Sequence, residues 1–318
     1  GGGGTGSADL ALLSAVNGRV TVNVQRNSGS GGGAITDTNA GAANIAASTA
    51  ILLAATGIGS TDPMDTQVGT IAFANSTSGH VQLNELSGSG GFIIGTVGTQ
   101  SSSSNAAASS PNNIVLTAGS PITFAHNVTS AGDLTATATD VAGTGDDITV
   151  NASVTVSADN VVFNAGDAIS MGANSLVQAT VAGGDVTFTA DSSTADTNGG
   201  MTLDGQIQAT TGTVTLQLNT RGPATPTSNA TTWIRAAELL LLSNTNDTAD
   251  FDLASIGNRI DTLAAATSGD VIVRDSTGGL TIGTIGATSG IVTGTSAATG
   301  ALVTINVPNG TITVSQPI

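Results

Sequence analysis

Residues 184–190 read Gly-Asp-Val-Thr-Phe-Thr-Ala, a glycine and an aspartate followed by alternating apolar and polar side chains. Successive side chains of a β-strand point to opposite faces, so Val186 and Phe188 would face a core and Thr187 would face solvent. Glycine allows positive φ at a corner, and aspartate satisfies nearby backbone amides before a β-branched residue begins the strand. The stretch therefore predicts a corner followed by one half-buried strand.

This unit recurs along the chain. Short alternating runs occupy residues 20–24, 81–83, 148–150, 154–156, 214–218 and 312–314. The candidate starts of successive coils are Val20, Ile51, Val81, Ile114, Leu134, Val161, Val186, Val214, Leu239, Val271 and Leu302. Their spacing averages about 28 residues, which lies within the range of solenoid repeats.

The scarcity of aromatic residues separates a solenoid from other all-β folds. Aromatic residues make up 2% of the 318 residues, and tyrosine is absent. Immunoglobulin-type sandwiches depend on a buried Trp and a Tyr corner, and outer-membrane barrels need aromatic girdles. A β-solenoid instead stacks Val, Ile, Leu and Ala on like residues about 4.8 Å away. We therefore expect a right-handed parallel β-helix of about eleven coils.

The domain organisation follows from the same pattern. Residues 1–17 are expected to be a glycine-rich start or cap, and residues 18–318 a single continuous β-solenoid. Residues 48–100 resemble residues 236–288, because Thr-Ser-Gly-His-Val at 77–81 returns as Thr-Ser-Gly-Asp-Val at 267–271. Ile-Gly-Thr-Val-Gly at 94–98 likewise returns as Ile-Gly-Thr-Ile-Gly at 282–286. Duplication of whole coils explains both echoes. Loops between coils are expected at 29–33, 101–113 and 222–232.

Composition excludes several classes of function. The chain has no Cys, its six basic residues are all Arg, and its formal net charge is −16. It therefore has no disulfide framework, no thiolate zinc site and no P-loop lysine. The acidic balance argues against nucleic-acid partners and anionic membranes, and no apolar run is long enough for membrane insertion. No secretion leader opens the sequence, which suggests a mature protein or an internal piece of a larger one.

Three strings carry a family resemblance: Gly-Asp-Leu-Thr-Ala-Thr at 132–137, Asp-Ile-Thr-Val-Asn at 147–151 and Leu-Thr-Ile-Gly-Thr-Ile at 280–285. They resemble the repeat region of filamentous-haemagglutinin-like large exoproteins, the giant β-helical adhesins of bacterial surfaces. The resemblance runs through about residues 18–318. It implies secretion, a right-handed parallel β-helix, and a role in attachment or biofilm matrix. Those proteins carry an N-terminal secretion domain with Asn-Pro-Asn motifs, which this chain lacks, so the piece would belong to the shaft.

Candidate catalytic residues are few, and we expect no enzyme. Pectin-cleaving hydrolases share the architecture and use clustered aspartates, so Asp146 and Asp147 make a β-helix glycosidase an outlying alternative. The Gly-His-Gly and Arg-Ile-Lys patterns of those enzymes are missing. His80 and His126 replace Asp or Asn of sister coils and are expected to be surface turn residues.

Calcium is the one cofactor that the residues suggest. Asp247, Asp250 and Asp252 form an oxygen-rich cluster, and hard cations prefer several such ligands. Asp62 with Asp65, and the glycine-rich stretch ending at Asp9, are weaker candidates. The competing interpretation is that these carboxylates are solvated turn residues.

Self-association is the interaction that the pattern favours. The last coil, with Ile312 and Val314, reaches almost to the end of the sequence, and both terminal coils look nearly uncapped, so either the native chain continues in both directions or its copies stack. In the run 239–242 one leucine pair must face outward, either covered by a loop or in contact with a neighbouring chain; Leu240 and Leu242 are the expected contact residues. We expect an extracellular structural segment of a cell-surface or matrix fibre, or adhesin shaft, that self-associates end to end or laterally. The alternative is a glycan-binding adhesin whose outward Asn, Asp and Thr ladders hold sugars with the help of calcium. Sugar binding usually uses aromatic platforms, and Trp233 and Phe92 are too few to favour it.

Overall fold

The computed structural model describes residues 6–25, 31–86, 91–139, 145–191, 199–219, 224–225, 232–243, 249–255, 257–276, 278–294 and 301–318. Every regular element in these ranges is a β-strand, and they contain no helix. The chain forms two compact units: unit 1 is Gly1–Thr139 with Thr155–Asp159, and unit 2 is Asp140–Val154 with Asn160–Ile318.

The strands are short and follow one another closely in each unit. Those of unit 1 are β1 (Ala8–Leu10), β2 (Leu13–Asn23), β3 (Ile35–Asp37), β4 (Ile45–Ala54), β5 (Met64–Asn75), β6 (Val81–Glu85), β7 (Phe92–Ile94), β8 (Ser102–Asn105), β9 (Ile114–Ala118), β10 (Ile122–Phe124), β11 (Asn127–Ser130), β12 (Leu134–Ala138) and β14 (Thr155–Ala158). Those of unit 2 are β13 (Ile148–Val150), β15 (Val161–Ala165), β16 (Ala168–Met171), β17 (Leu176–Ala179), β18 (Val186–Ala190), β19 (Gly200–Leu203), β20 (Gln206–Leu218), β21 (Ala224–Thr225), β22 (Trp233–Ser243), β23 (Phe251–Leu253), β24 (Arg259–Ala266), β25 (Val271–Arg274), β26 (Leu280–Ile282), β27 (Thr284–Ile285), β28 (Thr288–Ser289), β29 (Ile291–Val292), β30 (Val303–Asn306) and β31 (Ile312–Val314).

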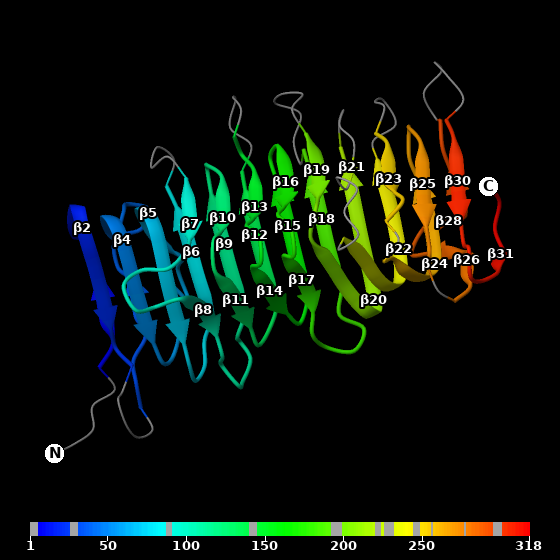
Figure 1. Ribbon diagram of the computed structural model, residues 1–318. Coiled ribbons are helices and arrows are strands. Elements are labelled where there is room, and N and C mark those ends of the chain that lie inside the picture. Colours follow the sequence, from blue (N-terminus) through cyan, green and yellow to red (C-terminus); the bar gives the residue numbers. More distant parts are fainter. Residues whose placement is uncertain are drawn as a thin grey trace. The chain divides into compact units, whose positions relative to one another are not determined.

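Unit 1 stacks its strands in parallel (Figure 1). One column of inward side chains passes from Val81 to Ile114 and on to Leu134, each in direct register with the next. All three side chains are completely buried. The chain therefore climbs one level per coil and fills its interior with β-branched and leucine side chains, as the sequence predicts.

Unit 2 has the same construction. A column of inward residues runs Val161, Val186, Val214, Leu239, Leu263, Ile282 and Val314. Successive levels lie between 19 residues apart, from Leu263 to Ile282, and 32 residues apart, from Ile282 to Val314. The prediction of an all-β parallel β-helix is confirmed; its right hand stays a prediction.

Two details of the sequence interpretation are wrong. Ile51 was expected to begin a coil, but it points outward from β4 between the fully buried, inward Ala50 and Leu52. The serine-rich stretch from Ser101 was expected to be a loop, yet Ser102–Asn105 is strand β8, and Ser103 is 1% exposed. Serine is small enough to enter the narrow interior, where its hydroxyl accepts a hydrogen bond from the Phe73 amide at 3.1 Å.

A β-hairpin covers the outer face of unit 1. After β7 the chain turns at Gly98, whose φ is +60°, and Val97 and Gln100 exchange two backbone hydrogen bonds of 3.1 and 3.0 Å. Val97 packs with the outward-facing Ile51 and Ala72 in a cluster separate from the interior core. Apolar side chains on the wet face of the long strands are thereby removed from water.

Unit 2 repeats this arrangement. Here β27 and β28 form an antiparallel pair around Gly286, whose φ is +57°. The hairpin contacts β22 and β24, and the outward Ala264 beneath them is fully buried. In both units the hairpin separates two short strands that pair with the same long strand. In unit 1, β7 and β8 both pair with β5; in unit 2, β26 and β29 both pair with β24. The echo between residues 94–98 and 282–286 thus corresponds to the same local structure, and whole-coil duplication stays a prediction.

The hairpin of unit 1 is expected to contribute measurably to stability. Replacing Val97, which is 3% exposed, with serine removes most of the apolar cover from Ile51. We expect the free energy of unfolding to fall by about 2 kcal/mol, the value of burying one such side chain. Urea denaturation measures this. Thr96→Ser, at an exposed position of the same hairpin, should change it by less than about 0.5 kcal/mol, and equal losses in both variants would contradict the assigned packing.

Candidate functional site

The C-terminal end of unit 2 exposes the interior of its β-helix. Strands β30 and β31 pair with β25 and β26 on one side, and no strand among the described residues pairs with their other edges. Ile312 and Val314 stack in register on Leu280 and Ile282, which are completely buried. They are themselves 44% and 56% exposed.

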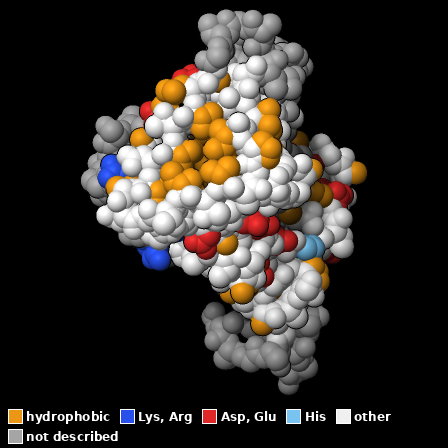
Figure 2. Space-filling view, turned by 90° about the vertical axis from the view of Figure 1, so that its right-hand side faces the viewer, with side chains coloured by type: hydrophobic (Ala, Val, Ile, Leu, Met, Phe, Trp, Pro, Cys, Tyr) orange, Lys and Arg blue, Asp and Glu red, His pale blue; other side chains and the backbone are white. Residues whose placement is uncertain are grey.

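We call Val303, Ile305, Ile312 and Val314 the C-terminal end surface. Val303 and Ile305 are half-buried and stack on Val271 and Val273 in the same way. Figure 2 views unit 2 from this end and shows a group of hydrophobic side chains in a largely uncharged surround. Period-2 alternation at 303–306 could have added Val303 and Ile305 to the predicted residues Ile312 and Val314.

Charge is absent from this part of the chain. No Asp, Glu, Lys, Arg or His occurs between Ser276 and Ile318, whereas the whole chain has a formal net charge of −16. The charged residues nearest in sequence are Arg274 and Asp275, and Asp275 is completely buried. The C-terminal end surface therefore combines exposed apolar side chains and free strand edges in a segment without charged side chains.

The N-terminal end of unit 1 is covered only in part. Strand β2 pairs with β4 and has no second strand partner among the described residues. Its inward Val20 and Val22 are 8% and 7% exposed and therefore buried. The inward Leu13 is 37% exposed, and Leu12 and Val16 beside it are 59% and 70% exposed. This end is therefore closed at the two valines and leaves apolar side chains exposed near Leu13.

Leu240 and Leu242 lie where the alternation places them. Both point outward from β22 and are half-buried, while Leu239 and Leu241 point inward and are completely buried. Leu240 lies in register between Thr215 and Ala264, the latter beneath the hairpin of β27 and β28. The outward leucines are therefore partly covered by the chain itself.

The predicted calcium cluster is not assembled by the described residues. Asp247 lies outside them. Asp250 accepts a hydrogen bond from the Asp270 amide at 2.8 Å, and Asp252 accepts one from the Ala254 amide at 3.3 Å. The described part of the chain contains no group of three or more His, Cys, Asp or Glu side chains arranged for a metal ion. Asp62 is exposed, whereas Asp65 is buried and accepts a hydrogen bond from the Asn84 amide group at 2.6 Å.

A thermal melt tests the calcium prediction directly. An ion that binds only the folded chain raises the melting temperature, by an amount that grows with its concentration. If Asp247, Asp250 and Asp252 bind calcium, the melting temperature in millimolar calcium should exceed that in chelator, and Asp250→Asn should abolish the difference. Superimposable melts of the unmodified chain would remove calcium from consideration.

The aspartates considered for glycosidase chemistry act within corners. Asp167, which is 3% exposed, accepts hydrogen bonds from the Gly145 and Asp146 amides at 2.6 and 3.1 Å. Asp147 accepts one from the Ala168 amide at 2.9 Å. Burial raises the pKa of Asp147, and the nearby Asp167 carboxylate adds to that rise. These contacts are those of turn residues that satisfy buried amides.

Of the two histidines, His126 is not a surface residue, contrary to expectation. His126 is 6% exposed, and its Nε2 lies 2.8 Å from the Ser103 hydroxyl in the interior of unit 1. His80 is half-buried, and its Nδ1 accepts a hydrogen bond from the Asn113 amide at 3.2 Å. Because Ser103 is 1% exposed, its hydroxyl is closed to a substrate, and the Ser103–His126 pair serves packing.

Burial lowers the pKa of His126, which predicts acid sensitivity. The unfolded chain has a histidine pKa of about 6.5, so it takes up a proton before the folded chain does. The free energy of unfolding should therefore fall as pH drops below about 6.5, by up to about 1.4 kcal/mol per pH unit, and be fully retained above that value. Urea denaturation between pH 5 and 7 measures this slope. His126→Asn should reduce the slope, and an unchanged slope in this variant would refute the assignment.

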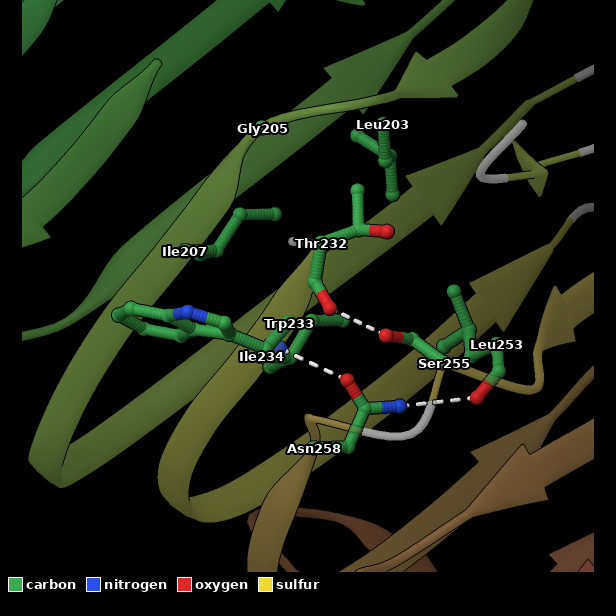
Figure 3. A pocket seen from close by; sticks show the side chains of 9 residues that line it. All are labelled: Leu203, Gly205, Ile207, Thr232, Trp233, Ile234, Leu253, Ser255 and Asn258. Atoms are coloured by element: carbon green, nitrogen blue, oxygen red, sulfur yellow. Dashed lines mark hydrogen bonds between the residues drawn. The ribbon is translucent and has the colours of Figure 1, made fainter. Parts of the chain in front are cut away.

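A small hollow in unit 2 lies beside the only tryptophan. It is partly open to solvent and lies between the buried apolar side chains of Leu203, Ile207, Ile234 and Leu253. Its polar groups bond to one another: the Ile234 amide donates to Asn258 Oδ1 at 2.8 Å, and Asn258 Nδ2 donates to the Leu253 carbonyl at 2.8 Å (Figure 3). These residues offer a ligand little that is unpaired, so we interpret the hollow as a packing gap.

The aromatic candidates for glycan binding are poorly placed. Phe92 is completely buried in β7. Trp233 is half-buried, and the Arg235 guanidinium lies 4.1 Å from its ring centroid. A sugar platform needs an open aromatic face, and Phe92 has none.

Comparison with family models, with curated proteins and with solved structures finds no match to this chain. No helix in the described residues is both long and apolar enough to cross a membrane.

Proposed function

We propose that this chain is a structural segment of an extracellular fibre or adhesin shaft, and that its copies associate end to end. The observation that carries the proposal is the C-terminal end surface. Ile312 and Val314 there are 44% and 56% exposed, although their register places them in the core column. Large apolar side chains in that arrangement, beside free strand edges, mark an interaction site.

A β-helix suits a shaft because each level is bonded to the next by a complete parallel ladder. Buried amides reinforce the corners: Asn75 Nδ2 donates to Asn105 Oδ1 at 2.9 Å, and Asn105 donates to the Asn113 carbonyl at 3.0 Å. Buried polar groups without partners at these corners would lower the stability of the fold, and the hydrogen bonds of the stacked asparagines avoid that loss. Rigidity of this kind serves a spacer or a scaffold.

The extracellular location is supported by composition and resemblance. The chain lacks lysine, cysteine and tyrosine and is rich in Ser and Thr, as in secreted repetitive proteins. The strings at 132–137, 147–151 and 280–285 resemble the shaft of filamentous-haemagglutinin-like bacterial exoproteins. A cell-surface or biofilm-matrix role follows from that resemblance.

We propose a non-enzymatic role, because the described candidates for catalysis are engaged elsewhere. Asp147 and Asp167 accept backbone amide hydrogen bonds, and His126 lies in the interior. Glycan binding is the alternative function. Phe92 is buried and offers no aromatic face to a sugar, and the face of Trp233 is partly covered by Arg235.

Immunogold electron microscopy of the producing cells tests location and role together. An antibody raised against the 318-residue chain should label the cell surface or the surrounding matrix, along fibres. Label confined to the cell interior would overturn the proposal.

A further inference from the structure

We propose that the corner at Asp275 and Ser276 in unit 2 is a pH-sensitive switch, which is held firmly when the Asp275 side chain is a neutral acid and opens more often when that side chain is ionised. The switch is independent of the proposed role in a fibre. Its two residues lie between β25 and β26, where the chain passes from one face of the β-helix to the next. A further coil covers them, because the Asp275 amide donates to the Asn306 carbonyl at 2.9 Å.

The carboxyl group of Asp275 is completely buried and only partly hydrogen-bonded. Its Oδ1 accepts a hydrogen bond from the Ile260 amide of β24 at 3.1 Å, which joins this corner to the preceding coil. Its Oδ2 is buried and has no hydrogen-bond partner. Removing a carboxylate from water without pairing both oxygens costs far more free energy than removing a neutral acid. The position therefore favours the protonated form.

The preceding coil shows which side chain suits this corner. Asn258 lies between β23 and β24, which pair with β25 and β26, so it occupies the corresponding corner. Its Oδ1 accepts from the Ile234 amide at 2.8 Å, and its Nδ2 donates to the Leu253 carbonyl at 2.8 Å (Figure 3). Asparagine both accepts and donates, whereas an ionised aspartate only accepts. Protonation gives Asp275 the donor that it otherwise lacks.

The charged groups around Asp275 do not compensate for its burial. On β24, Asp261 and Arg259 act on it with opposite signs, and the repulsion from Asp261 is the larger effect. Two other charged side chains of the neighbouring strands β23 and β25 point outward: Asp252 and Arg274. Residues 276–318, which supply the covering coil, contain no charged or titratable side chain. A negative charge on Asp275 is therefore left without a balancing cation among these groups.

The direction of the pH dependence follows from these surroundings. Burial raises the pKa of Asp275, and the nearby Asp261 carboxylate adds to that rise. Backbone amides and the Arg259 guanidinium oppose the rise without cancelling it. The folded chain thus binds this proton more tightly than the unfolded chain, whose aspartate pKa is about 3.9. The stability of the corner grows as the pH falls through the folded pKa, and the gain is complete near the unfolded value.

Hydrogen exchange of backbone amides in the full chain tests this switch. The reporters are the amides of Ile260, which donates to Asp275 Oδ1, and of Ser276, which donates to the Asn258 carbonyl at 2.9 Å. After correction for the intrinsic exchange rate at each pH, their protection should increase several-fold as the pH falls from about 7 to about 4. His126, whose protonation is expected to have the opposite effect on stability, lies in unit 1, so these local reporters separate the two groups.

Two variants assign the effect to Asp275. Asp275→Asn keeps the acceptor oxygen, adds the donor that Asn258 has, and cannot ionise. Its protection at about pH 7 should equal that of the unmodified chain at about pH 4 and should not vary between them. Asp270→Asn is the matched control, because Asp270 also accepts a backbone hydrogen bond, from the Leu302 amide at 2.8 Å, but is only half-buried. It should leave the pH dependence unchanged.

Three results would refute the switch at Asp275. Protection that is independent of pH in the unmodified chain would show that no such group titrates in this corner. The same pH dependence in Asp275→Asn would assign the titration to another residue. Lower protection in Asp275→Asn at every pH would mean that the carboxylate is the favoured form. None of these results bears on the end-to-end association, which depends on other residues.

Discussion

Replacing Phe188 with alanine is expected to lower the free energy of unfolding of unit 2 by about 3–5 kcal/mol. Phe188 is completely buried in β18, and its ring stacks on Phe163 with centroids 5.0 Å apart and planes 3° from parallel. Leu216 lies in register on its other side. The rigid ladder on both sides prevents collapse, so the variant keeps a cavity in the narrow interior. Urea denaturation followed by circular dichroism measures the loss.

Thr187→Ala is the matched control, because Thr187 neighbours Phe188 on the same strand and points outward. It should change the free energy of unfolding by less than about 0.5 kcal/mol. Similar losses in both variants would contradict the inward and outward assignment of β18.

Replacing Ile312 with aspartate is expected to weaken self-association at least about 30-fold, since an unpaired charge buried in an apolar contact costs about 2 kcal/mol or more. Ile312 is 44% exposed in the single chain and would be covered in an end-to-end contact. Light scattering over a range of concentrations measures the dissociation constant.

Thr313→Asp provides the comparison, because Thr313 is exposed and points away from the core column. A solvated charge there costs about 1 kcal/mol or less, which corresponds to a change of about fivefold or less. Equal weakening by both substitutions would exclude the apolar column as the contact.

The architecture could be predicted from sequence because one rule repeats in every coil. Alternation at Val186-Thr187-Phe188 and at Val214-Thr215-Leu216 gives the inward and outward faces. Because inward residues stack on inward residues of the next coil, the register between the two strands follows. The scarcity of aromatic residues then separates the β-helix from a sandwich. The predicted starts Val81, Ile114 and Leu134 do form one column.

The exceptions arose where one coil interacts with another part of the chain. Ile51 looks like an inward strand residue, yet it faces a hairpin formed some 40 residues later, around Val97. Ser103 and His126 look like loop and turn residues, but each pairs with the other in the interior at 2.8 Å. Local pattern carries no information on such pairings.

The candidate site was predictable only in part. Ile312 and Val314 follow from alternation, and the structure adds Val303 and Ile305 to the same layer. At the other end, the burial of Val20 and Val22 beside the exposed Leu12 and Val16 depends on tertiary contacts that the local pattern does not reveal.

Sedimentation equilibrium of the unmodified 318-residue chain, from about micromolar to about millimolar concentration, tests the self-association most directly. The average mass should rise above 30.6 kDa as the concentration increases. A mass that stays at 30.6 kDa throughout this range would contradict self-association through the C-terminal end surface.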